Sequence, residues 1–292
     1  GMGFLAAFLV NDTIALVGIP IVTHLSRKLG IRPAVLLISL AFGITTGSVM
    51  TPIGNPQNLL VAIQSRISFP FTSFLLFLGV PTIANLFLTS LILRTYFRKE
   101  LAGLPKPIKV KIDEEEGYGV TSATMQGSKF TNSSSPFSPS PQLARLSTAI
   151  LIATVAGFLI SELLHFLNIA NFGLSAIAMI GAAALYSMSR DRIEIMKGVD
   201  YSILIFFAAM FVVTSAMWSS GAISFIMSHL PSPDRENLLQ SNAVISLVSV
   251  ALSQILSNVP FVALYNFVMA SNGFTGAYVG QWMMLAAAST IA

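Results

Sequence analysis

The chain contains apolar stretches that are long enough to cross the hydrocarbon core of a bilayer, which is about 30 Å thick and needs roughly 20 helical residues. These stretches cover residues 71–93, 146–169, 172–188, 201–230 and 238–256. Hydrophobic residues make up 54% of the sequence and charged residues only 10%, whereas an ordinary soluble domain has roughly 25% charged residues. We therefore predict an all-α polytopic membrane protein.

Other apolar stretches are shorter and end at polar interruptions, as half-helices do. They cover residues 3–10, 14–23, 34–50, 59–63, 261–270 and 277–292. Two interruptions stand out, Val-Asn-Asp-Thr at residues 10–13 and Ser-Asn-Val-Pro at residues 257–260. Irregular backbone at membrane depth is tolerated where it lines a cavity rather than facing lipid. Both interruptions therefore indicate a transport site.

The basic residues indicate the topology. If residues 10–13 and 257–260 are tips of re-entrant hairpins, all of the 16 Lys and Arg residues except Arg66 and Arg235 fall on one side of the membrane. The positive-inside rule makes that side the cytoplasm. We expect the first hairpin to open inward, the second to open outward, and the protein to be a multi-pass protein of the cell membrane. The net charge of +4 does not indicate nucleic-acid binding, because the basic residues lie between membrane segments.

A polar linker divides the chain into two halves. Residues 100–145 are rich in proline and serine and carry an acidic run, so they cannot bury a core and are expected to form a flexible cytoplasmic linker. The first repeat, residues 1–99, holds a hairpin tip at 10–13 and a broken helix at 51–58. The second, residues 146–292, holds a tip at 257–260.

The two tips align with each other. Residues 9–16 match residues 256–264 with one residue of slip, and each tip carries an asparagine, Asn11 and Asn258. We predict inverted repeats with two re-entrant helical hairpins and broken transmembrane helices. In such transporters the binding site lies where the repeats meet, near the membrane midplane.

The repeats are unequal in length. The second begins about residue 146, long before Asn258, whereas the first has very little sequence before Asn11. The break at Gly54-Asn55 also has no counterpart after Asn258. We therefore expect the chain to be a fragment that lacks the first helices of repeat one and the last broken helix of repeat two.

The broken helix carries the string Thr-Pro-Ile-Gly-Asn-Pro-Gln-Asn at residues 51–58. Its two prolines remove helical donors and free upstream carbonyls, and Gly54 allows the backbone to approach a solute closely. Asn55, Gln57 and Asn58 add neutral amides. Freed carbonyls suit a small cation, whereas half-helix N-termini suit an anion or a hydroxylated neutral solute.

These strings resemble the signatures of the ion transporter superfamily, which includes arsenite efflux permeases, NhaD-type sodium/proton antiporters, citrate-type carriers and divalent-anion symporters. The matching strings are Asn11-Asp12-Thr13, the run at residues 51–60 and Ser257-Asn258-Val259-Pro260. The run Gly-Asn-Pro-Gln-Asn-Leu-Leu at residues 54–60 points to the arsenite-permease and anion-permease branch. The resemblance covers nearly the whole chain.

The resemblance implies a homodimeric carrier in the lipid bilayer, with the tips and the broken helix binding substrate and a coupling ion, sodium or proton. The expected substrate and ion ligands are Asn11, Asp12, Thr13, Gly54, Asn55, Asn58, Ser257 and Asn258, with sodium at the Asn11 and Asn258 tips and no other cofactor. Two positions depart from the pattern. Val10 replaces a frequent serine, and Val259 replaces the threonine of dicarboxylate symporters, which disfavours a dicarboxylate substrate.

Ionisable residues inside apolar stretches need separate interpretation. Asp12 lies between apolar arms, where a charge is by default functional. It is expected to handle the coupling ion or a proton, to cap a half-helix starting at Ile14, or both. Glu162 and His165 share a helix face, and they form either a proton relay or, as we expect, polar contacts with the membrane interface.

The resulting prediction is a secondary active transporter of a small inorganic anion or a hydroxylated neutral solute such as arsenite, which works by alternating access. The alternatives are a sodium/proton antiporter, an ion channel and a non-functional fragment of a carrier. An enzyme is not expected, because Asp12 has no second carboxylate near it in the membrane segments and the three histidines are scattered.

Overall fold

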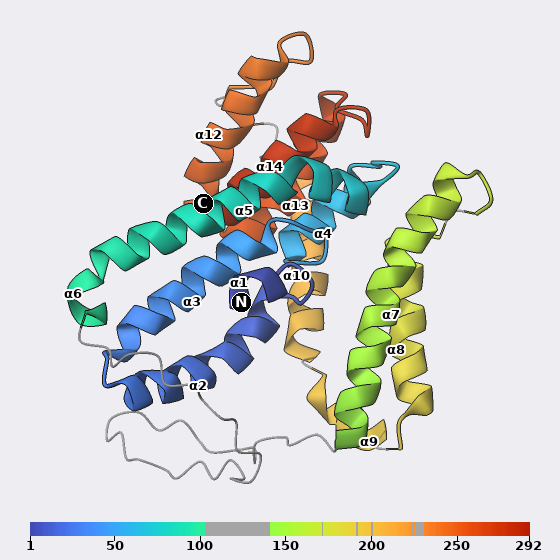
Figure 1. Ribbon diagram of the computed structural model, residues 1–292. Helices are drawn as coiled ribbons and strands as arrows, with labels where there is room; N and C mark the ends of the chain where they lie inside the picture. The colour runs from blue at the N-terminus through green and yellow to red at the C-terminus, as the bar shows by residue number, and fades with distance from the viewer. Residues whose placement is uncertain (103–140, 171, 191, 200, 223–224, 226–230) are drawn as a thin grey trace.

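The computed structural model describes the chain except residues 103–140, 171, 191, 200, 223–224 and 226–230. The described residues form helices and no strand, so the prediction of an all-α polytopic membrane protein is confirmed (Figure 1). The helices are α1 (Met2–Leu5), α2 (Asn11–Leu29), α3 (Pro33–Ser48), α4 (Pro56–Gln64), α5 (Pro70–Tyr96), α6 (Arg98–Leu101), α7 (Pro141–Phe166), α8 (Leu174–Met188), α9 (Arg192–Gly198), α10 (Tyr201–Ser219), α12 (Leu238–Leu256), α13 (Asn258–Ser271) and α14 (Val279–Ile291). The predicted linker, residues 100–145, lies largely outside the described residues.

Within the described residues, four helices are long and apolar enough to cross a membrane: α5, α7, α10 and α12. The predicted span at residues 172–188 is shorter than expected, because α8 has 15 residues and therefore extends only about 22 Å. Part of the predicted span 201–230 lies outside the described residues, and α10 ends at Ser219. The repeat and hairpin assignments remain predictions.

Proline and glycine set the limits of the helices around the site. Pro33, Pro56 and Pro70 occupy the first position of α3, α4 and α5, where the missing N–H needs no partner and the fixed φ favours a helix. Gly30 closes α2 in the left-handed conformation, with φ 66°. The amide of Ile31 then donates to the carbonyl of Ser26, as in a Schellman motif.

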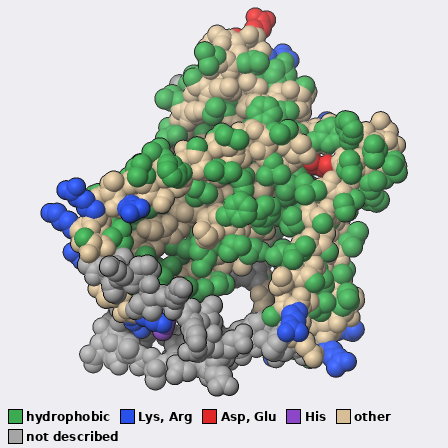
Figure 2. Space-filling model, in the orientation of Figure 1, with side chains coloured by type: hydrophobic (Ala, Val, Ile, Leu, Met, Phe, Trp, Pro, Cys, Tyr) green, Lys and Arg blue, Asp and Glu red, His purple; other side chains and the backbone are tan. Residues whose placement is uncertain are grey.

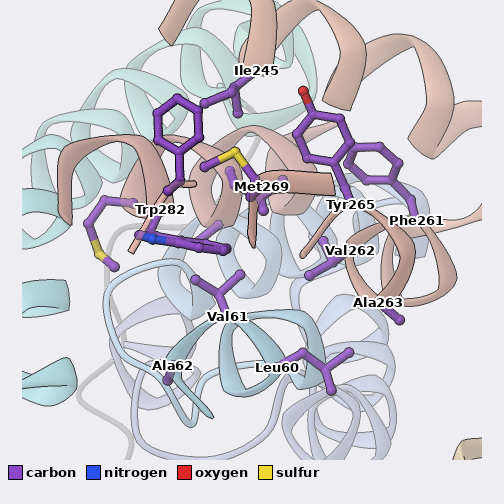
Figure 3. Packing of buried hydrophobic residues seen from close by; sticks show 14 of the residues in the cluster. Leu60, Val61, Ala62, Ile245, Phe261, Val262, Ala263, Tyr265, Met269 and Trp282 are labelled. Atoms are coloured by element: carbon purple, nitrogen blue, oxygen red, sulfur yellow. The ribbon is translucent and has the colours of Figure 1, made fainter. Parts of the chain in front are cut away.

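The main core lies where the last three helices meet the short helix α4. Side chains of α4, α12, α13 and α14 converge there (Figure 3), and the largest buried ones include Val61, Ile245, Tyr265 and Trp282. A second, smaller cluster of Ala6, Ile14, Leu40 and Ile44 joins α1, α2 and α3. The first and second halves of the chain therefore pack against each other in one body.

The α7–α8 pair stands beside this body and touches it through the start of α5 (Figure 1). Hydrophobic side chains cover much of the visible face, whereas most Lys and Arg side chains in view lie at its left edge and lower right, where α6 and α9 are found in Figure 1 (Figure 2). An apolar surface of this kind suits contact with lipid.

The expectation that Glu162 reaches the membrane interface is wrong. Glu162 of α7 is buried, and its carboxylate accepts the backbone N–H groups of Phe71 at 2.5 Å and Thr72 at 2.9 Å and the Thr72 hydroxyl at 2.6 Å. A carboxylate at a helix N-terminus is stabilised by the free N–H groups and by the helix dipole. Nearby, His165 Nδ1 lies 3.3 Å from the carbonyl of Ser68. Glu162 therefore fastens α7 to α5.

Candidate functional site

A cavity of about 600 Å³ lies between the two predicted tips. Both polar interruptions contribute to its wall, together with the start of α4 and the ends of α12 and α14. Its lining residues are Asn11, Asp12, Pro56, Gln57, Ser253, Gln254, Ile255, Leu256, Ser257, Asn258, Val259 and Ala292. Among the described residues, the lining thus offers amides, hydroxyls and one side-chain carboxylate, and no Lys or Arg.

The predicted site residues fall into two groups. The structure brings Asn11, Asp12, Ser257 and Asn258 together at the cavity. Thr13, Gly54, Asn55 and Asn58 do not line it; Thr13 is exposed, and the other three are buried behind the wall.

Three polar residues of the cavity wall, Gln57, Ser253 and Gln254, were not among the predicted ligands. Gln57 lies in the signature string itself. Ser253 and Gln254 precede Ser257 by four and three residues, and this spacing places them near the tip on one side of α12. Polar residues one helical turn before a predicted tip would therefore have indicated Ser253 and Gln254 as wall residues.

The first tip is fixed by backbone contacts. α2 begins at Asn11 rather than at Ile14, so Asp12 lies inside the first helical turn and not at the capping position expected for it. The Asn11 side-chain carbonyl accepts the N–H of Asp12 at 3.0 Å. The backbone N–H of Asn11 donates to the carbonyl of Gly54 at 3.0 Å. This bond joins the tip to the broken helix.

The second tip consists of the single residue Ser257 between α12 and α13. Its backbone has φ 66° and ψ 156°, a conformation that is nearly restricted to glycine and costs on the order of 1–3 kcal/mol. No side-chain hydrogen bond caps α13 at this residue. A strained residue exposed at the edge of a cavity is a frequent feature of functional sites.

The end of α3 leaves carbonyls without helical partners, and Asn58 satisfies them. Its side-chain nitrogen lies 3.1 Å from the carbonyl of Ser48, 3.2 Å from that of Val49 and 3.0 Å from that of Thr51, so its two N–H groups are shared among three acceptors. Asn58 is fully buried. The carbonyls that the sequence offered to a small cation are therefore bonded to an amide of the protein itself.

Asn55 and Thr290 complete this buried network. The Asn55 side-chain oxygen accepts the backbone N–H of Asn58 at 2.8 Å and so caps α4. The Thr290 hydroxyl of α14 lies 3.2 Å from Asn58 Oδ1, and Asn55 Nδ2 lies 3.3 Å from the same hydroxyl. In this conformation, Asn55 and Asn58 maintain the shape of the break and connect it to α14.

Gly54 has a steric role in the same break. A Cβ at this position would lie 2.1 Å from the carbonyl oxygen of Ser48, which is far inside van der Waals contact. Only glycine allows the end of α3 and the start of α4 to approach so closely.

The cavity wall suits a particular class of solute. Amides and hydroxyls both donate and accept hydrogen bonds. The helices α2, α4 and α13 begin at residues of this wall, and helix N-termini favour negative charge. Asp12 is exposed and supplies the single carboxylate of the wall. The described wall therefore offers groups that can hydrogen-bond a polar solute.

Comparison with known proteins gives the family. The family model described as citrate transporter matches residues 1–292. Among relatives, a silicon efflux transporter of Oryza sativa subsp. japonica is 28% identical over 98% of this chain and 65% of its own length. A 46 kDa membrane protein of Mycobacterium leprae is 25% identical over 88% of this chain and 54% of its own.

An arsenical pump membrane protein of Escherichia coli is 23% identical over 88% of this chain and 55% of its own length. The chain thus spans between about half and two thirds of the length of these relatives. The match to the family model extends over every residue of the chain and includes both tips and the broken helix. This chain belongs to the citrate transporter family.

Proposed function

We propose that the protein is a secondary active transporter of a small hydroxylated oxyacid that is neutral or weakly charged, such as arsenous or silicic acid. The observation that carries the proposal is the cavity between the two tips, whose wall combines neutral hydrogen-bonding groups with a single carboxylate. Two relatives are named for silicon and arsenical compounds. Both elements form largely uncharged hydroxylated acids in neutral water, and such molecules match a wall of amides and hydroxyls.

The absence of basic residues from the cavity wall argues against a strongly charged anion. Lys and Arg are the usual partners of carboxylate and phosphate groups, and neither lines this cavity. A citrate-like polyanion would therefore need bound cations to offset its charge. A neutral hydroxylated solute needs no such compensation, which makes it the better match.

Asp12 is the proposed site of coupling. Among the described lining residues it is the one with an ionisable side chain, and we propose that it exchanges a proton or holds a sodium ion while solute hydroxyls bind the amides beside it. The buried network around Asn58 leaves the carbonyls at the end of α3 already bonded. The coupling ion is therefore assigned to the tips rather than to the break, in a protein of the cell membrane that works by alternating access.

The test is transport by the protein reconstituted in liposomes. Uptake of arsenous acid, silicic acid, phosphate and citrate is compared under imposed proton and sodium gradients. Saturable uptake and counterflow of the two neutral acids, driven by one of the gradients, support the proposal. Selective uptake of phosphate or citrate contradicts the solute class, and single-channel currents contradict a carrier.

A further inference from the structure

The buried face of α12 carries two serines whose hydroxyl groups are unsatisfied. Ser249 and Ser253 lie four residues apart on the same face, and their relative exposures are 0% and 5%. Neither hydroxyl oxygen has a hydrogen-bond partner among the described residues. An unpaired buried hydroxyl is destabilising, so two of them in one row require an explanation.

Other serines in the helices of this protein show the usual solution. A helical serine can donate to the carbonyl three or four residues earlier on its own helix. Ser246 of α12 donates in this way to Asn242 at 2.7 Å, and Ser39 of α3 donates to Val35 at 2.7 Å. The hydroxyls of Ser249 and Ser253 differ from these, because they make no such bond although their own helix offers the same carbonyls.

One of the two unsatisfied serines, Ser253, lies at the cavity. Ser253 lines the cavity wall, and Ser257, one turn further, is the second tip and lines it as well. Ser249 is one turn deeper on the same face of α12, which packs against α13 and α14. Among the described residues, Ser253 is therefore the one α12 serine that lines the cavity in addition to the tip residue Ser257, and Ser249 lies one turn behind it.

We propose that Ser253, with Ser249 behind it, forms a subsite that binds a hydroxyl group of the transported solute. This inference rests on the proposed function and specifies where the solute binds. A serine hydroxyl both donates and accepts, and a solute hydroxyl supplies the complementary pair. The oxygen of Ser253 is covered in this conformation, so the solute reaches it when the tip end of α12 shifts.

The test compares three single variants by uptake of arsenous acid into liposomes. Ser253→Ala should raise KM about three- to tenfold with little change in kcat, because one hydrogen bond to the solute is lost. Ser253→Thr keeps the hydroxyl and should restore most of the affinity. Ser246→Ala is the control, since that hydroxyl already bonds its own helix, and its kinetics should match those of the wild type.

A second measurement separates solute binding from a structural role. If the hydroxyl of Ser253 is only an unsatisfied group, Ser253→Ala should raise the Tm of the purified protein and leave KM unchanged, and this outcome overturns the subsite. If the hydroxyl of Ser253 binds solute, arsenous acid should raise the Tm of Ser253→Ala less than it raises the Tm of the wild type.

The two proposals fail in different ways. A wild-type protein that transports neither arsenous nor silicic acid overturns the proposed function and the subsite together. Wild-type uptake with unchanged Ser253→Ala kinetics overturns the subsite alone.

Discussion

The hydroxyl of Thr290 lies 3.2 Å from the side-chain oxygen of Asn58, although 232 positions separate the two residues in the chain. The contact joins α14, near the end of the chain, to the helix that follows the first break. Both residues are buried. The geometry of the break therefore depends on both halves of the chain.

Replacing Thr290 by valine should destabilise the protein by about 1–3 kcal/mol, because the buried Asn58 Oδ1 and the carbonyl of Ala286, which both lie within hydrogen-bond distance of the Thr290 hydroxyl, would lose that partner. Thermal unfolding in detergent measures the effect as a fall in Tm. Thr290→Ser retains the hydroxyl and should lose much less. Equal losses in the two variants would show that packing of the methyl group, and not the hydrogen bond, is what matters.

Replacing Asp12 by asparagine should abolish ion-coupled transport and leave membrane insertion intact, because the substitution keeps the size of the side chain and removes the only side-chain carboxylate among the described residues of the cavity wall. Uptake under imposed proton and sodium gradients is the measurement. Glu236→Gln changes an exposed carboxylate away from the cavity and is the control. Unchanged transport with an unchanged pH dependence would contradict the role of Asp12.

Replacing Gly54 by alanine should destabilise the fold by about 3 kcal/mol or more, because the new Cβ would meet the carbonyl of Ser48 and neither backbone segment can move aside easily. The yield of folded protein and its Tm are the measurements. Gly280→Ala is the matched control, since no atom lies within 4 Å of a Cβ there. A Gly54→Ala protein as stable as the control would refute the steric argument.

Replacing Glu162 by alanine should loosen the contact between α7 and α5, because the N–H groups of Phe71 and Thr72 would lose their acceptor. Hydrogen exchange at these two amides should become faster, and the Tm should fall. Thr72→Val removes only one of the three bonds and should have the smaller effect. Slow exchange retained at both amides in Glu162→Ala would show that Glu162 is not needed there.

The sequence was sufficient to predict the local features of the fold. Runs of apolar residues predicted the long helices, and the prolines at residues 33, 56 and 70 lie where helices begin, because the physics of both signals is local. The role of Gly54 in a close approach was also predictable in kind. Its partner is the carbonyl of Ser48 rather than a solute.

Long-range partners could not be predicted. That Asn58 binds a solute or ion stays a prediction. The sequence did not indicate that its amide nitrogen lies near three carbonyls of its own chain or that Thr290 of the other half lies beside it. Glu162 was expected to reach the membrane interface, as polar side chains near a helix end often do. Nothing in its own helix indicates that the start of α5 lies beside it. Nothing in the sequence distinguishes Ser253 from other helical serines, because its burial beside the cavity and its unsatisfied hydroxyl depend on packing between helices.

The two tips of the cavity differ in how firmly they are held. At the first tip, the backbone N–H of Asn11 donates to the carbonyl of Gly54 in the helix break, and the Thr51 hydroxyl donates to the carbonyl of Ala7. On the other side Ser257 holds an unfavourable backbone conformation without a side-chain cap. Relaxation of that conformation releases energy, whereas displacing Asn11 breaks a hydrogen bond, so we expect the tip at Ser257 to move more readily than the tip at Asn11.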